Sequence, residues 1–154
     1  MRIAFVLTLL IAAIGFGVFL LRPADTTTYI QPTHTLTIAG VSVPVALART
    51  SAERTQGLSG ITNLRGTEGM FFVFEEDGRH GFWMKDMLFP IDILWLSFEG
   101  RVVHIERMVQ PSSYPEALVS PVSARYVLEV PSGFSDVHGI KIGDSATLSG
   151  NTPL

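Results

Sequence analysis

Beyond residue 35 the apolar residues of this chain tend to recur at every second position, and this period constrains the fold more than any other feature. The segments 36–38 and 41–47 alternate, whereas 70–74 (MFFVF) and 91–98 (IDILWLSF) are apolar at almost every position. A period of two is typical of a β-strand, and a strand covered on both faces is apolar throughout. We therefore predict an all-β domain at residues 36–154, built as a β-sandwich, a jelly roll or a small barrel. The chain contains no cysteine, so packing must stabilise this domain without disulfides.

Two short helices are expected within the β domain. Thr50 and Glu53 have the spacing of a capping box, and Gly57 or Gly60 would end the helix that follows. A second helical turn is predicted for 132–138, because a glycine follows it directly.

A run of 19 uncharged, mostly apolar residues, 3–21, lies between Arg2 and Arg22. As a helix it would extend about 28 Å, close to the ~30 Å hydrocarbon core of a bilayer. Cleavable signal peptides have a shorter apolar region of about 7–15 residues, followed by small residues at the cleavage site. We therefore predict an uncleaved transmembrane signal anchor at 1–24, with cleavage and secretion as the alternative. Residues 25–35 have the composition of a linker, and we expect the N-terminus inside and the domain in the periplasm or outside the cell.

The charge of the chain argues against nucleic-acid binding. The whole chain has 11 basic and 14 acidic residues, a net charge of −3. Without Arg2, Arg22 and Asp25, which flank the apolar run, 9 basic and 13 acidic residues remain, a net charge of −4. Nucleic-acid-binding surfaces are usually basic, and an acidic domain is not attracted to anionic lipid headgroups. We therefore expect no nucleic-acid partner and membrane contact through residues 3–21.

Six short motifs indicate a family. They are GLSG at 57–60, GMFFVF at 69–74, FWMKDM at 82–87, PIDI at 90–93, LEVPSG at 128–133 and GIKIGD at 139–144. In this order they resemble the domain-of-unknown-function 192 family, also called uncharacterised protein family 0127, over residues 36–148. The sequence departs from the commoner pattern at Ser59, Asp86 and Met87, where methionine, asparagine and threonine are more usual. The resemblance implies an N-terminal signal or anchor and a jelly-roll-like β domain, and it implies no activity, substrate or catalytic residue.

A candidate ligand site lies in the most aromatic part of the chain. Trp83, Lys85, Asp86 and Asp92 place a few polar groups within an apolar stretch, which is the usual composition of a binding pocket. Trp83 would have to be exposed at a loop to act as a stacking platform. By alternation Asp92 shares a strand face with apolar residues, so burial would raise its pKa unless a cation or several backbone N–H groups held it ionised. It could instead be a structural acid, with Lys85, Arg54 or Arg125 as its partner.

Three other functions remain open from the sequence. A hydrolase could use Asp86 and Asp92 as acid and base. A carrier of Cu(I) could use His80, Met84 and Met87, since imidazole and thioether ligands suit this ion. An envelope module could bind a partner along an exposed strand edge.

We nevertheless expect a ligand-binding or envelope-associated domain rather than an enzyme, because nucleophile, phosphate-loop and dinucleotide motifs are absent from the sequence. The histidines are scattered without the spacing of a zinc site, and we expect no cofactor. Arg125 and Glu129 lie too far apart along one strand to pair with each other. Each is expected to have a structural partner on a neighbouring strand.

Overall fold

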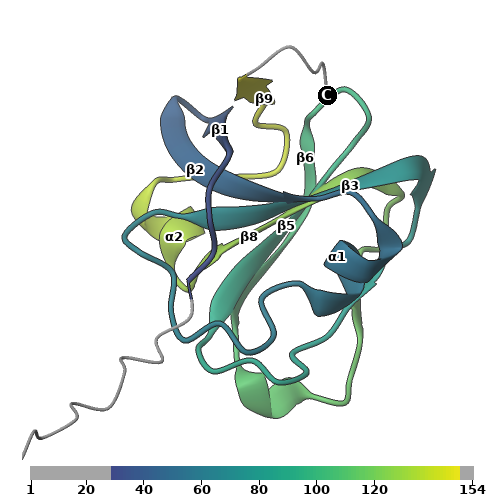
Figure 1. Cartoon of the computed structure of the whole chain (residues 1–154). Helices are drawn as coiled ribbons and strands as arrows, with labels where there is room; N and C mark the ends of the chain where they lie inside the picture. Colours follow the sequence, from purple (N-terminus) through teal and green to yellow (C-terminus); the bar gives the residue numbers. More distant parts are fainter. Residues whose placement is uncertain (1–28, 150–154) are drawn as a thin grey trace, which may run out of the picture.

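The structure is a computed structural model that describes residues 29–149. Its main feature is a seven-stranded sheet in the order β6-β5-β8-β3-β2-β1-β9 (Figure 1). These strands are β1 His34–Ile38, β2 Val41–Ala48, β3 Gly69–Gly78, β5 Ile91–Leu96, β6 Val102–Val109, β8 Ala124–Pro131 and β9 Ala146–Ser149. A two-stranded ribbon is formed by β4 Gly81–Phe82 and β7 Leu118–Val119. The helical segments are α1 Ser51–Gln56, α2 Phe134–Val137 and a 3₁₀ turn, Pro111–Ser113.

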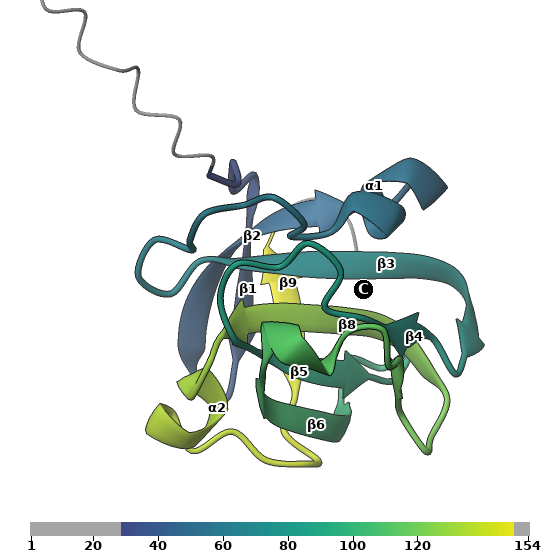
Figure 2. The same ribbon diagram turned by 90° about the horizontal axis from the view of Figure 1, so that it is seen from below.

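The sheet curls into a half-barrel. Its neighbouring strands are antiparallel except for β2 and β3, which are parallel and are joined by a crossover that contains α1. The two ends of the sheet come together before β6 and before β9, where Arg101 and Ser145 form a β-bridge. The helices α1 and α2 lie at opposite sides of the molecule (Figure 2).

Both faces of the central strands are covered. One apolar cluster fills the inside of the curl and includes Phe71 and Leu94, whereas a second lies on the outer face and includes Phe72 and Trp95. Adjacent residues of β3 and of β5 therefore enter different clusters, which explains why these strands are apolar at consecutive positions. The outer face is covered by the α1 segment and by the chain around β4, and this cover creates the cavity described below.

The mostly-β class and the short helices are confirmed. Of the architectures expected, a barrel is the nearest, because one sheet curls and the small β4–β7 ribbon does not form a second full layer. A continuous apolar run indicates that both faces of a strand are covered, but it does not indicate which elements cover them. The sequence could therefore not distinguish a sandwich from a curled sheet. Among residues 29–149 no helix is long and apolar enough to cross a membrane, and the anchor predicted at 1–24 lies outside this range.

Candidate functional site

A cavity of about 240 Å³ opens on the outer face of the sheet. Its apolar walls come from three separate parts of the chain: Leu58 after α1, Phe72 and Phe74 on β3, and Phe82 and Met87 around β4. Its lining also includes polar and exposed groups, namely Ser51, Arg54, Thr55, Gln56, Ser59 and Trp83, and one buried acid, Glu129 of β8. The cavity thus combines aromatic and aliphatic walls with polar groups contributed mainly by α1 and the loop after it, a combination that suits a small ligand.

The helix α1 is held at the cavity by its own caps. Thr50 Oγ1 accepts a hydrogen bond from the N–H of Glu53, and the Glu53 carboxylate accepts from the N–H groups of Thr50 and Arg49, both at 2.8 Å. These bonds form the capping box that the sequence predicted and lower the pKa of Glu53. Gly57 ends the helix with a φ of +49°, a conformation that favours glycine, so Leu58 turns into the core.

The loop after α1 is tied to the loop after β4 by main-chain groups. Ser59 Oγ donates to the carbonyl of Lys85 at 2.7 Å, and the N–H of Gly60 donates to the carbonyl of Asp86 at 3.0 Å. The backbone of the FWMKDM motif therefore fixes two walls of the cavity relative to each other.

Arg54 supplies the positive charge at the cavity. Its guanidinium donates to the carbonyls of Arg49 and Val73, the latter at 3.0 Å, and lies over the ring of Phe74 with 5.0 Å to the centroid. Because these acceptors are neutral carbonyls, the charge of Arg54 is not cancelled by a salt bridge among the described residues.

The aromatic walls are mutually supported. Phe82 makes edge-to-face contacts with Phe72 at 4.9 Å and with Trp95 at 5.9 Å between ring centroids. Behind the cavity wall, His80 stacks on Phe74 at 3.5 Å. These packed rings leave the walls little freedom to collapse, so the cavity is preformed.

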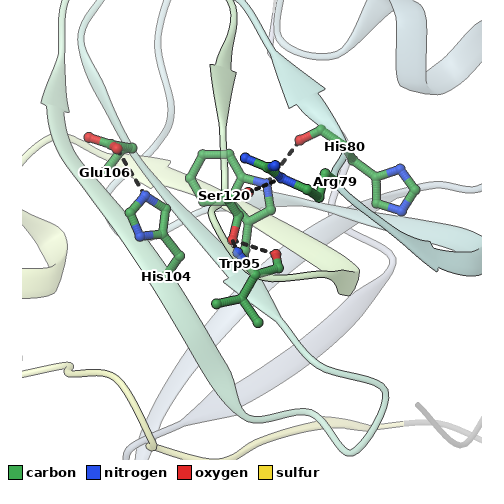
Figure 3. Close-up of polar contacts among 7 residues, drawn as sticks. Arg79, His80, Trp95, His104, Glu106 and Ser120 are labelled. Atoms are coloured by element: carbon green, nitrogen blue, oxygen red, sulfur yellow. Dashed lines mark hydrogen bonds and ion pairs between the residues drawn. The ribbon is translucent and has the colours of Figure 1, made fainter.

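Polar bonds hold the chain around β4 from behind. Trp95 Nε1 donates to the carbonyl of His80 at 3.1 Å, and Arg79 Nε donates to the carbonyl of Ser120 at 3.0 Å (Figure 3). Figure 3 also shows the pair of His104 and Glu106, at 2.9 Å, on the neighbouring strand β6.

Glu129 is the acidic group of the cavity. It lies on β8 between Met70 of β3 and Ile93 of β5, and its side chain is only 4% exposed. Its Oε2 atom has no hydrogen-bond partner, and burial raises the pKa of this carboxyl to about 8. At neutral pH the group is therefore an uncharged carboxylic acid, which can donate one hydrogen bond as well as accept.

The expectation that Glu129 has a structural partner on a neighbouring strand is wrong, because its Oε2 has no hydrogen-bond partner among the described residues. No salt bridge within residues 29–149 involves it, whereas Arg125 pairs with Asp77 of β3 at 2.7 Å as expected. The sequence carried one signal that could have found the site. Glu129 lies two residues after Val127, on the same apolar face of β8. The neighbouring strands β3 and β5 contain no lysine, arginine or histidine that could pair with it.

The four residues predicted as a ligand site do not line one cavity. Trp83 does line it, with half of its surface exposed and an edge-to-face contact with Tyr114 at 6.4 Å. Lys85 and Asp86 are exposed side chains outside the lining, and their carbonyls make the loop contacts described above.

Asp92 is fully buried away from this lining. Its Oδ1 accepts from the N–H groups of Met108 at 2.9 Å and Gly133 at 3.0 Å, and its Oδ2 accepts from that of Ser135 at 2.9 Å. The expected cationic partners Lys85, Arg54 and Arg125 are not used; backbone N–H groups hold it instead. The geometry is that of the structural acid rather than of a free base.

The residues weighed as Cu(I) ligands are engaged in packing. Met84 and Met87 are buried in the outer apolar cluster, and His80 stacks on Phe74 while its Nε2 lies 3.2 Å from the carbonyl of Glu76. Within residues 29–149 no group of three or more His, Cys, Asp or Glu side chains could hold a metal ion.

The chain is similar in sequence to an uncharacterised family, and in both sequence and fold to solved proteins. The family model that matches residues 34–148 is DUF192, described as an uncharacterized ACR, and no curated protein matches. A solved protein of unknown function from Novosphingobium aromaticivorans DSM 12444 is 33% identical with a TM-score of 0.68, over 73% of this chain and 82% of that one. A solved protein from Sinorhizobium meliloti 1021, described as a putative transcription regulator, is 26% identical with a TM-score of 0.69, over 73% and 91% of the two chains.

Proposed function

The chain belongs to the DUF192 family, and from that premise we propose that it is a binding module for a small, largely apolar molecule held in the cavity beside Glu129. One observation carries the proposal. A preformed cavity with aromatic walls is lined by Glu129, an acid whose buried Oε2 has no hydrogen-bond partner. Leaving a buried polar atom unsatisfied costs about 1–3 kcal/mol. A ligand in the cavity beside Glu129 could satisfy such a group.

The size of the cavity limits the ligand. Its 240 Å³ corresponds to roughly eight water molecules at ~30 Å³ each, which is below the usual range for drug-sized ligands. A molecule, or the end of a longer one, with about ten non-hydrogen atoms would fill it. The exposed ring of Trp83 offers a surface for any part that extends outside.

Binding is favoured over hydrolysis by the state of the two predicted acid residues. Both oxygens of Asp92 are occupied by backbone N–H groups, and Asp86 is exposed and outside the cavity lining. A general base must reach a substrate proton within hydrogen-bond distance, and neither carboxylate faces the cavity in which a substrate would lie. The net charge of −4 beyond residue 25 likewise supports a ligand other than nucleic acid.

We further propose that the domain is held at a membrane surface, in the periplasm or outside the cell. The support is the uncharged run at 3–21, which has the length of a transmembrane helix. In this arrangement the linker at 25–35 would leave the cavity free to face the aqueous compartment.

The cavity is tested by closing its mouth. Thr55 is an exposed residue of α1 that lines the cavity, whereas Ala52 is exposed on the same helix and does not line it. Thr55→Trp should abolish the binding of small neutral aromatic fragments to the full-length chain, measured by ligand-observed NMR. Ala52→Trp, the matched control, should leave binding unchanged.

Two results would contradict the proposed function. One is a wild-type chain that binds no fragment of about ten non-hydrogen atoms at millimolar concentration. The other is equal fragment binding by Thr55→Trp and the wild type, since the ligand would then lie elsewhere.

A further inference from the structure

We infer that the ligand of this cavity presents an uncharged acceptor oxygen, the carbonyl of a ketone, ester or amide, to the carboxylic acid of Glu129. The inference rests on the proposed function, since it names the chemical class that the same cavity would bind. It starts from the hydrogen-bonding capacity of one buried side chain and the charges that surround it.

The state of Glu129 sets the first requirement. A neutral carboxylic acid has an O–H to donate, and Glu129, whose buried Oε2 has no partner, is one of the residues that line the cavity. An acceptor atom on the ligand would satisfy that O–H without creating a charge in the low-dielectric interior. A ketone or ester carbonyl provides an acceptor and no competing donor.

The charges that face Glu129 set the second requirement. Among the lining residues contributed by α1, β3, β4 and their loops, Arg54 is the only other ionisable side chain. His80, behind the Phe74 wall, is partly buried, which lowers its pKa, so it is uncharged across the neutral and alkaline range. The cavity therefore contains one fixed positive charge and one neutral acid at physiological pH.

This distribution disfavours charged ligands of either sign. An ammonium group would meet the uncompensated charge of Arg54 and would have to ionise Glu129, creating an ion pair whose desolvation is costly in a buried site. A carboxylate would lose its hydration between the apolar walls of the cavity, where Nη1 of Arg54 already donates to the carbonyls of Arg49 and Val73. An uncharged carbonyl compound avoids both penalties.

Three probes of similar size separate these classes. Acetophenone carries a carbonyl, α-methylstyrene has the same shape with a methylene in place of the oxygen, and benzylamine carries a cation. We expect the full-length chain to bind acetophenone at pH 6.5 at least about tenfold more tightly than α-methylstyrene, the effect of one hydrogen bond of about 1.4 kcal/mol. Benzylamine should bind more weakly than acetophenone.

The pH dependence gives a second, independent readout. Acetophenone affinity should fall by about fivefold between pH 6.5 and pH 9, because only about a tenth of Glu129 stays protonated one unit above a pKa of about 8 and the ionised form binds without the hydrogen bond. The affinity of α-methylstyrene should not fall over this range, since it accepts no proton-dependent hydrogen bond. A ¹³C label at the carbonyl should report the hydrogen bond as a downfield shift in the bound state.

Two variants identify the donor. Glu129→Gln keeps an uncharged donor of nearly the same shape, so it should bind acetophenone without the loss at pH 9. Glu129→Met removes the donor, so it should bind acetophenone and α-methylstyrene equally. If either variant does not fold, the wild-type comparison of the two neutral probes across pH still decides the question.

The outcomes distinguish failure of this inference from failure of the proposed function. Equal binding of acetophenone and α-methylstyrene, independent of pH, would overturn the carbonyl class while leaving a binding cavity in place. Tighter binding of benzylamine with release of a proton would overturn it in favour of a cationic ligand. Binding of none of the three probes at millimolar concentration would overturn both.

Discussion

At the scale of single residues, the two buried acids of the sheet, Asp92 and Glu129, differ in their hydrogen-bond partners. Asp92 is held by three backbone N–H groups, which give both of its carboxylate oxygens a hydrogen-bond donor. Glu129 has no such donors at Oε2, and its pKa is raised to about 8 by burial. Asp92 therefore stabilises the fold, whereas Glu129 destabilises it at neutral pH, and a group retained at such a cost is a candidate for function.

Because burial raises the pKa of Glu129, the free energy of unfolding of the wild type and of Glu129→Gln should differ by an amount that depends on pH. The ordinary pKa of 4.5 applies to the unfolded chain and a pKa of about 8 to the folded one, so between these values the folded state binds one more proton than the unfolded state. Stability contributed by this group is then lost as pH rises, at about 1.4 kcal/mol per pH unit. From pH 5 to pH 7, Glu129→Gln should gain roughly 3 kcal/mol in free energy of unfolding relative to the wild type.

Urea denaturation of both chains at several pH values measures this difference. Because all other titratable groups are the same in the two chains, their contributions cancel when the curves are subtracted. A constant difference from pH 5 to pH 7 would show that Glu129 is ionised in the folded state.

At the scale of elements, Asp92 joins three pieces of structure through one side chain. It lies on β5 and bonds to Met108 of β6, to Gly133 and to Ser135 of α2. Met108 has a φ of +51°, and the register between β5 and β6 shifts nearby, so its N–H would otherwise lack a regular partner. The carboxylate thus permits an irregular edge of the sheet to pack against a short helix.

Asp92→Asn should therefore loosen this junction. The amide has one oxygen in place of two, so its NH₂ must face at least one backbone N–H, and we expect a loss of about 2–4 kcal/mol in free energy of unfolding. Hydrogen exchange should show the largest loss of protection at Met108 and Ser135. Asp86→Asn, at an exposed position, is the matched control and should stay within about 0.5 kcal/mol of the wild type.

A different result would change the role of Asp92. If Asp92→Asn were as stable as Asp86→Asn but lost fragment binding in the cavity, Asp92 would belong to the ligand site and not to the sheet junction.

At the scale of the whole molecule, the apolar residues of the chain form two groups along the sequence. Within residues 29–149 they fill the inside of a curled sheet and cover its outer face. The run at 3–21 lies outside that domain, and its length matches a bilayer rather than a core of this size.

The proposed anchor predicts the location of the full-length chain. Expressed in a bacterium, it should stay in the membrane fraction after an alkaline carbonate wash, at the mass of the uncleaved chain. Leu10→Arg should reduce this retention, because an arginine at the centre of a transmembrane helix costs about 2.5–3.5 kcal/mol on insertion. Ala52→Trp, in the domain, serves as the control. A soluble product that lacks the first residues would instead support cleavage and secretion.

The sequence by itself determined the features that depend on neighbouring residues. Alternation predicted the strands, consecutive apolar residues in β3 and β5 predicted cover on both faces, and the spacing of Thr50 and Glu53 predicted the capping box. Each of these patterns reports local geometry, which acts over two to four residues.

Only the tertiary structure decided which acid faces the cavity and which is structural. The donors to Asp92 lie 16, 41 and 43 residues away along the chain, so no local pattern could reveal them. Glu129 meets its apolar surroundings because the α1 loop and the β4 segment fold over the same strand face. Burial and pairing fix the charge of a carboxyl, and both depend on contacts that form only when distant segments pack together.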